Sequence, residues 1–218
     1  SLVNAPKLKG WRARVWRLRL HAGIVMLGWR YHLASKIVAV TESLRRDLVS
    51  EYRVPSGKTG VFANGANVQL FVPLESAGCK SRLGLAHRKR YLGFVGNMCK
   101  WHGLDDLIVA FSAIAAERED AQLLLVGDGV EAPRLKSIVR QLGLTTRVDF
   151  VGHVPYGDVV FYINACEFCV GPFNGWVRDR TCGASPLKIY EYLACGKPVL
   201  TSDLVDLKFI AENGAGRL

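Results

Sequence analysis

Hydrophobic residues form short, almost unbroken runs that alternate with longer mixed stretches over the second half of the chain. The runs YLGFVG (91–96), QLLLVG (122–127) and VDFVG (148–152) are typical of buried strands. The stretches 103–118 and 132–143 between them are expected to be helices. Strand–helix alternation with such apolar strands predicts an α/β fold with a doubly wound, Rossmann-like parallel sheet covered on both faces.

The same alternation continues to the end of the chain. A polar segment follows each apolar run. The chain shows no internal repeat and no low-complexity tract. The remaining elements are expected, in order, as a helix near 157–164, a strand at 168–173, a helix at 185–194, a strand at 198–203, a helix at 204–212 and a further strand beginning in the closing ENGAGRL.

The helix in SPLKIYEYLACGKPVLTSD (185–203) carries a distinctive pair of charges. Ser185 is expected to cap it through its hydroxyl, with Pro186 at the first helical position and Gly196 ending it. Lys188 and Glu191 are three residues apart and therefore share a face near the N-terminus, where free N–H groups favour an anion. This arrangement suits a sugar nucleotide, and the alternative is an ordinary surface ion pair.

The first third of the chain has a different pattern. Residues 10–34 place an apolar stripe beside several arginines, which fits either an interfacial membrane helix or a helix packed on its own domain. Residues 36–55 are expected to form a strand, a cap at Thr41 and a helix. The polar, basic stretch that follows indicates a domain boundary, so we expect domains at 1–75 and 91–218 joined by a linker at 76–90.

The charge of the chain is concentrated near its start. The 218 residues carry a formal net charge of +10, and residues 1–60 hold 12 of the 29 basic and 3 of the 19 acidic side chains. This asymmetry indicates an anionic surface partner, either membrane lipid or nucleic acid. Nucleic acid is disfavoured because aromatic residues interleave with arginine in one short helix only, so the prediction is no nucleic acid and a peripheral membrane contact through residues 10–34.

The six cysteines do not form a disulfide framework at this chain length, which favours a reducing, cytoplasmic compartment. Cys166 and Cys169 have the spacing of a redox or metal motif, but two small residues in a buried strand are the better interpretation. No signal peptide and no bilayer-length apolar run are evident, and the first and last residues suggest a fragment cut at both ends. We expect a cytoplasmic location. A more specific expectation is the inner face of the plasma membrane.

Ligands of parallel sheets bind outside the carboxyl ends of the strands. Here those ends carry Gly96-Asn97, Gly127-Asp128-Gly129 and Gly152-His153. In the loop GNMCKWHG (96–103), Lys100 and His102 lie beside a helix N-terminus where a phosphate would bind well. No G-x-G-x-x-G follows a strand, so hydride transfer is disfavoured.

From about Tyr91 onward the chain resembles the C-terminal, donor-binding domain of retaining glycosyltransferases of the GT-B fold, family 4. The resemblance lies in FVGNMCKWHGLDDLIVAF, LLLVGDGVEAPRL, RVDFVGHV and SPLKIYEYLACGKPVLTSD, in the family's order and spacing. Upstream, SKIVAVTESLRRDL and VFANGANVQLFVP resemble the end of the family's N-terminal domain. The resemblance implies a truncated remnant of a second Rossmann-like domain before the donor domain.

The resemblance also implies roles for particular residues. Glu191 matches the second glutamate of the family's pair, which binds the ribose hydroxyls. The implied remaining contacts are the backbone N–H groups of Ser185, Pro186 and Leu187 on the diphosphate, Gly152, His153 and Val154 beside the base, and Gly127, Asp128 and Gly129 lining the site.

Three positions depart from the family pattern. The first glutamate of the pair falls at Gly183, so what replaces its contact to the donor sugar is open. The usual Arg and Lys at the diphosphate fall at Asn97 and His102, which leaves Lys100 and Lys188 as the expected substitutes. We assign the catalytic role, stabilisation of the leaving diphosphate, to Lys188.

The resemblance implies transfer of a sugar from a nucleotide-sugar donor to a glycan or lipid-linked acceptor, as in polysaccharide or cell-envelope synthesis. No cofactor and no metal are expected, because a helix terminus and lysines can neutralise the diphosphate and no Asp-x-Asp triplet is present. One alternative is a sugar-nucleotide epimerase using His153 and Asp128, and another is a non-catalytic membrane-surface module. The family's catalytic histidine and acceptor cleft belong to the segment expected to be missing.

Overall fold

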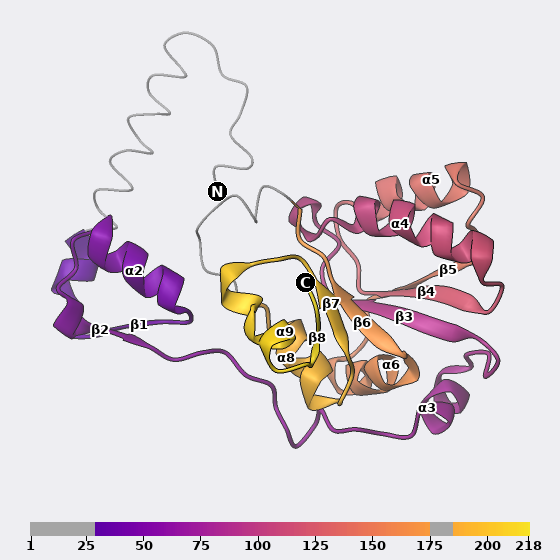
Figure 1. Ribbon diagram of the computed structural model, residues 1–218, viewed down its shortest axis with the longest axis horizontal. Helices are drawn as coiled ribbons and strands as arrows, with labels where there is room; N and C mark the ends of the chain where they lie inside the picture. Colours follow the sequence, from indigo (N-terminus) through magenta and orange to yellow (C-terminus); the bar gives the residue numbers. More distant parts are fainter. Residues whose placement is uncertain (1–28, 175–184) are drawn as a thin grey trace, which may run out of the picture. The chain divides into compact units, whose positions relative to one another are not determined.

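The computed structural model describes residues 29–174 and 185–218, and the chain divides into two units, Ser1–Phe62 and Ala63–Leu218 (Figure 1). In the first unit, strands β1 (Ile37–Ala39) and β2 (Thr59–Val61) pair in parallel around helix α2 (Glu42–Ser50) and a 3-10 turn at Ser56–Lys58. The Thr41 hydroxyl accepts a hydrogen bond from the Leu44 N–H at 3.1 Å, which confirms the predicted strand, cap and helix. Of the predicted helix at 10–34, the described residues 29–33 are helical and the others lie outside the described ranges.

The described part of the second unit contains a six-stranded, all-parallel sheet in the order β5-β4-β3-β6-β7-β8. This order corresponds to 3-2-1-4-5-6 along the chain, so the winding reverses between β3 and β6. The doubly wound, parallel sheet predicted from the alternation of runs is confirmed. The strands are β3 (Arg90–Val95), β4 (Ala121–Val126), β5 (Val148–Gly152), β6 (Phe168–Gly171), β7 (Val199–Thr201) and β8 (Gly216–Arg217).

Helices cover both faces of the sheet, as Figure 1 shows. Helices α4 (Leu104–Glu117) and α5 (Ala132–Gln141) pack on one face against Leu92, Phe94 and Leu123. The other face, which includes Tyr91 and Leu124, is covered by α6 (Val159–Ala165), α8 (Leu187–Ala194) and α9 (Phe209–Glu212). Successive side chains along each strand point to opposite faces and therefore contribute to two separate hydrophobic cores.

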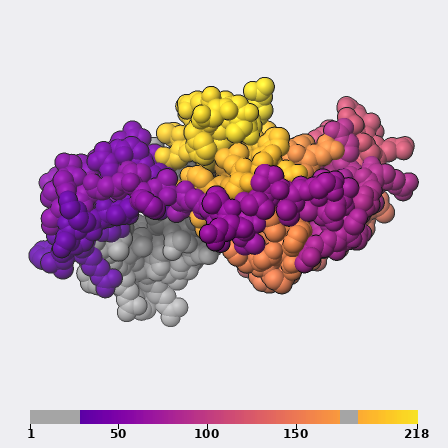
Figure 2. Space-filling view, turned by 90° about the horizontal axis from the view of Figure 1, so that it is seen from below, coloured from indigo at the N-terminus to yellow at the C-terminus, as the bar shows by residue number. Residues whose placement is uncertain are grey.

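Residues 63–90 belong to this second unit and differ from the predicted linker. Phe71 is fully buried in the core beside α6, and Asn164 holds the backbone of Val72 and Leu74 through bonds of 3.0 and 2.9 Å. Helix α3 (Ser76–Leu83), capped by the Glu75 carboxylate, packs against α6. In Figure 2 this segment is the purple-to-magenta band crossing the orange and yellow parts of the surface. The boundary between the two units therefore lies after Phe62. The burial of Phe71 and the capped helix α3 attach residues 63–90 to the second unit, although residues 76–90 are polar in composition.

The described part of this unit also contains the 3-10 turns η3 (Lys100–His102), η4 (Tyr156–Asp158) and η5 (Val205–Leu207). The predicted helix at 157–164 therefore begins as η4 and continues as α6, and the one at 204–212 is divided between η5 and α9.

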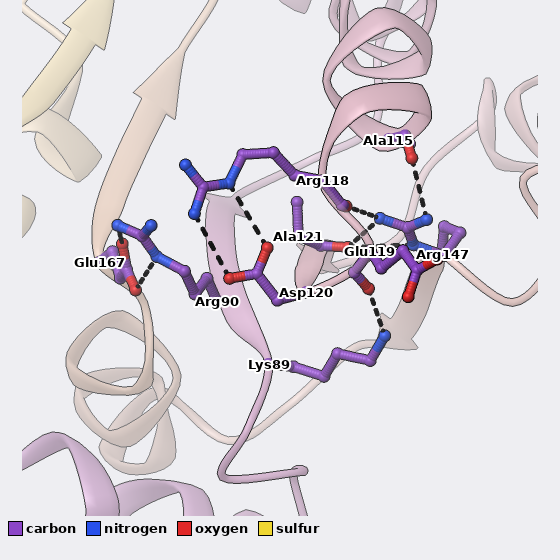
Figure 3. Close-up of polar contacts among 9 residues, drawn as sticks. All are labelled: Lys89, Arg90, Ala115, Arg118, Glu119, Asp120, Ala121, Arg147 and Glu167. Carbon is purple, nitrogen blue, oxygen red and sulfur yellow. Dashed lines mark hydrogen bonds and ion pairs between the residues drawn. The ribbon is translucent and has the colours of Figure 1, made fainter.

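Arginine side chains tie the elements together at the amino ends of the strands (Figure 3). The Arg147 guanidinium donates to the carbonyls of Ala115, Arg118 and Ala121 at 2.5–3.1 Å. It thereby joins the C-terminal end of α4, where a cation is favourable, to the start of β4. Arg90 pairs with Glu167 at 2.6 Å nearby. This charged edge stabilises the fold and lies opposite the carboxyl ends of the strands.

The five cysteines among the described residues are free and buried. Both Cys166 and Cys169 are buried as interpreted, but only Cys169 lies in the strand, β6, whereas Cys166 directly follows α6. Residues 29–174 and 185–218 contain no group of three or more His, Cys, Asp or Glu side chains that could bind a metal ion. Within the same ranges, no helix combines the length and the apolar character that crossing a membrane requires.

Candidate functional site

A cavity of about 500 Å³ opens at the carboxyl ends of β3, β4 and β5. It lies on the β3 side of the point where the winding of the sheet reverses, which is where ligands of such sheets bind. Five predicted site residues line it together with three further valines, a glycine and a tyrosine. The lining comprises Asn97, Gly127, Asp128, His153 and Val154 from the prediction, and Val95, Gly96, Val126, Tyr156 and Val159.

The three strand ends are held in direct contact at the cavity. The Gly127 N–H donates to the Gly152 carbonyl at 2.8 Å, and the Gly96 N–H donates to the Val126 carbonyl at 2.9 Å. Gly127 has φ +120°, and a Cβ on it would collide with the Gly96 carbonyl. Gly129 does not line the cavity, but a Cβ there would collide with Asn97 and Met98. These glycines are therefore needed to bring the loops together.

His102 lies behind the cavity wall, between the rings of Phe94 and Phe173 at centroid distances of 5.5 and 5.8 Å. Its Nδ1 is 2.6 Å from the Asn97 carbonyl, which can only accept, so Nδ1 carries the proton. Nε2 is then an acceptor and lies 3.1 Å from Lys188 Nζ. Burial, with a contribution from the Lys188 charge, lowers the pKa of His102 to about 4, so the ring is neutral.

Lys188 projects from the first turn of α8 towards the end of β3. Its Nζ lies 4.1 Å from the centroid of the Phe94 ring, and a Cβ on Gly96 would be 2.7 Å from Nζ. Burial lowers the pKa of Lys188 to about 7, against the opposing influence of Cys99 and Glu191. The ammonium group therefore sits directly beneath the Gly96 backbone, poised between its charged and neutral forms at neutral pH.

Glu191, one turn further along α8, is buried and accepts a hydrogen bond from the Tyr156 hydroxyl at 3.1 Å. Burial raises the pKa of Glu191, while the Tyr156 bond and the Lys188 charge lower it. Tyr156 lines the cavity, so it connects Glu191 to that space. Sequence reasoning missed Tyr156, although an aromatic residue between Pro155 and Gly157, just after a strand end, was a signal that could have found it.

The start of α8 differs from the prediction in two ways. Pro186, not Ser185, is the N-cap, and the Ser185 hydroxyl bonds instead to the Tyr190 hydroxyl at 3.1 Å. Pro186 has no N–H group, so within the predicted diphosphate segment only Ser185 and Leu187 can donate. The Asn64 side chain donates to the Ser185 carbonyl at 2.7 Å and holds this segment in place. Gly196, with φ +69°, ends the helix as predicted.

The structure does not bring every predicted residue to the cavity. Lys100 is exposed in η3 and is not part of the lining, and its carbonyl accepts a hydrogen bond from the Asn174 side chain. Lys188, Glu191 and His102 form a group behind the lining and reach the cavity through Gly96 and Tyr156. Gly183, where the family's first glutamate falls, lies outside the described residues.

The doubly wound parallel sheet, with its cavity at the strand ends, defines a Rossmann-like domain of the GT-B glycosyltransferase type. Solved structures share this fold. WaaG, a glycosyltransferase involved in lipopolysaccharide biosynthesis, matches with a TM-score of 0.70 at 19% identity, over 83% of this chain and 48% of that one. Anabaena HepE in complex with UDP and glucose matches with a TM-score of 0.64 at 22% identity, over 81% and 46%.

Residues 89–218 match the family model of glycosyl transferases group 1, and the chain belongs to that family. A D-inositol 3-phosphate glycosyltransferase from Thermobispora bispora is 26% identical over 191 residues, which are 84% of this chain and 43% of the relative. A GDP-mannose-dependent monoacylated alpha-(1-6)-phosphatidylinositol monomannoside mannosyltransferase from Corynebacterium glutamicum is 28% identical over 142 residues, 63% and 36% of the two chains. The chain thus spans less than half the length of these relatives.

Proposed function

We propose that this chain provides the donor site of a retaining glycosyltransferase and binds a nucleotide sugar in the cavity at the ends of β3, β4 and β5. The observation that carries the proposal is the placement of Lys188 and Glu191 by one helix behind that cavity, beneath Gly96 and beside Tyr156. Membership of the family and the UDP and glucose named for a structure of the same fold support it.

In this proposal Lys188 acts on the leaving group. As the bond between the sugar carbon and the phosphate oxygen breaks, its electron pair passes to that oxygen, and negative charge grows on the diphosphate. The ammonium group and the N–H groups of Ser185 and Leu187 stabilise that charge where it develops. Glu191 accepts hydrogen bonds from the ribose hydroxyls, and Gly152, His153 and Val154 lie beside the base.

The acceptor is proposed to be a glycan or a lipid-linked molecule in polysaccharide or cell-envelope synthesis. The phosphatidylinositol mannoside in the name of one relative supports a lipid-linked acceptor, whereas the inositol 3-phosphate named for another is a small polyol phosphate. We further propose that transfer takes place in the cytoplasm at the inner face of the plasma membrane, with residues 10–34 as the contact. Family membership favours sugar transfer over the epimerase and the membrane-module alternatives.

Isothermal titration calorimetry of the purified chain with UDP, GDP and ADP tests the proposal. Lys188→Met should weaken binding of the preferred nucleotide by about ten- to a hundredfold, and Glu191→Gln by about tenfold, because each removes a charge-assisted contact. Lys136→Met is the matched control, since Lys136 is exposed on α5 over Phe150 and away from the cavity. Absence of binding by all three nucleotides, or equal affinities of the Lys188 and Lys136 variants, would refute the donor site.

A further inference from the structure

Among the described residues, Tyr156 is the one member of the cavity lining whose side chain forms a hydrogen bond with Glu191. It occupies the first position of η4, just after the loop that follows β5. Its ring packs edge-to-face on Phe71, with centroids 5.4 Å apart, and Phe71 is fully buried. Tyr156 itself is 57% exposed. One side of its ring therefore packs on the buried Phe71, and the rest is accessible to solvent.

The Tyr156 hydroxyl bonds to one oxygen of the Glu191 carboxylate, Oε1. Among the residues that the structure describes, no other side-chain or backbone group donates a hydrogen bond to this carboxylate. Glu191 is only 8% exposed, and a buried carboxylate stays charged only where donors compensate for lost hydration. The phenol therefore has two effects: it favours the ionised acid and it fixes which oxygen remains available.

We propose that Tyr156 is a positioning residue that orients Glu191 to receive a vicinal diol, which makes the site selective for ribonucleotides over nucleotides lacking the 2′ and 3′ hydroxyls. The inference rests on the proposed function, because it assigns Tyr156 a role through the carboxylate that binds the ribose. With Oε1 held by the phenol, Oε2 and the remaining lone pair of Oε1 accept the two sugar hydroxyls. Loss of the phenol leaves the carboxylate free to rotate and less charged.

Tyr156→Phe tests this role, because phenylalanine keeps the packing on Phe71 and removes only the hydroxyl. Calorimetry with UDP and with 2′,3′-dideoxy-UDP separates orientation of Glu191 from simple packing. The variant should bind UDP about tenfold more weakly, the effect of one hydrogen bond to a charged group, and should bind the dideoxy nucleotide within about twofold of the unchanged chain. In a Glu191→Gln background the same substitution should change the affinity for UDP by less than about twofold.

Tyr162→Phe on α6 is the matched control and should leave both affinities unchanged, and thermal unfolding of each variant verifies folding. If Tyr156→Phe weakens the binding of both nucleotides equally, Tyr156 has a packing role only. If the affinity for UDP is unchanged in Tyr156→Phe, the hydroxyl has no role in binding. Either result overturns the inference while Glu191→Gln still weakens UDP binding. If Glu191→Gln has no effect, the ribose role of Glu191 in the proposed function fails as well, so the two failures are distinguishable.

Discussion

At the scale of single residues, the site depends on contacts between side chains far apart in the sequence. Glycines at strand ends and a lysine and a glutamate on one helix face could be predicted from spacing alone. Two hydrogen bonds could not be predicted in this way, the one between His102 and Lys188 and the one between Tyr156 and Glu191. Each depends on how α8 packs against a loop 35 or 86 residues away in the sequence. Sequence spacing finds residues within one element, whereas partnerships across elements need coordinates.

The lowered pKa of Lys188 leads to a pH prediction. In the free chain the ammonium group loses its proton above pH 7, since its pKa is about 7, and a bound diphosphate raises that pKa by favouring the charged form. Nucleotide affinity should therefore fall as pH rises from about 7 to 9, approaching tenfold per pH unit. Calorimetry with UDP over this range measures the slope. Lys188→Met should abolish the slope, and a flat profile for the unchanged chain would contradict the assignment.

At the scale of elements, most helices and strands follow from the alternation of apolar runs, and the ends of elements do not. Ser185 has the residue type of a cap, but its hydroxyl has a partner in Tyr190, and the backbone turns into the helix one residue later. Helix α3 escaped prediction because its sequence is polar and basic. It forms because the Glu75 carboxylate caps it and because α6 offers a surface to pack on.

The contacts of Arg147 predict an effect on stability. Replacing Arg147 with Met leaves the carbonyls of Ala115, Arg118 and Ala121 without their guanidinium donor, which should lower the free energy of unfolding by about 2 kcal/mol. Arg134→Met, which removes exposed ion pairs to Asp105 and Glu131, should cost less than about 1 kcal/mol. Urea denaturation followed by circular dichroism measures both. Similar losses for the two variants would mean that the Arg147 bonds add little.

At the scale of the whole molecule, the fold class could be predicted and the division of the chain could not. The sequence patterns favour a boundary in the polar stretch 76–90, yet Phe71 is buried in the core of the second unit. Burying one large side chain in a core contributes more to stability than many polar residues on a surface. The average composition of a segment does not reveal such a residue. The sheet itself was predictable because β3, β4, β5 and β6 read as almost continuous apolar runs, although the two-residue β8 does not.

This division predicts how shortened chains behave. A chain of residues 63–218 should fold cooperatively and bind nucleotide like the longer chain, because it retains Phe71, Asn64 and α3. A chain of residues 76–218 loses Phe71 and should be less stable by about 3–5 kcal/mol, the cost of removing a buried aromatic side chain. Thermal and urea unfolding of the two chains measure the difference. Equal stability would place the boundary nearer to residue 76.

The central claim is that a nucleoside diphosphate binds between the start of α8 and the ends of β3, β4 and β5. A crystal structure of the chain with UDP tests this most directly. The account predicts the diphosphate within hydrogen-bond distance of Lys188 Nζ and the Leu187 N–H, with the ribose hydroxyls on Glu191. A nucleotide bound outside the cavity, or one whose diphosphate turns away from α8, would contradict it.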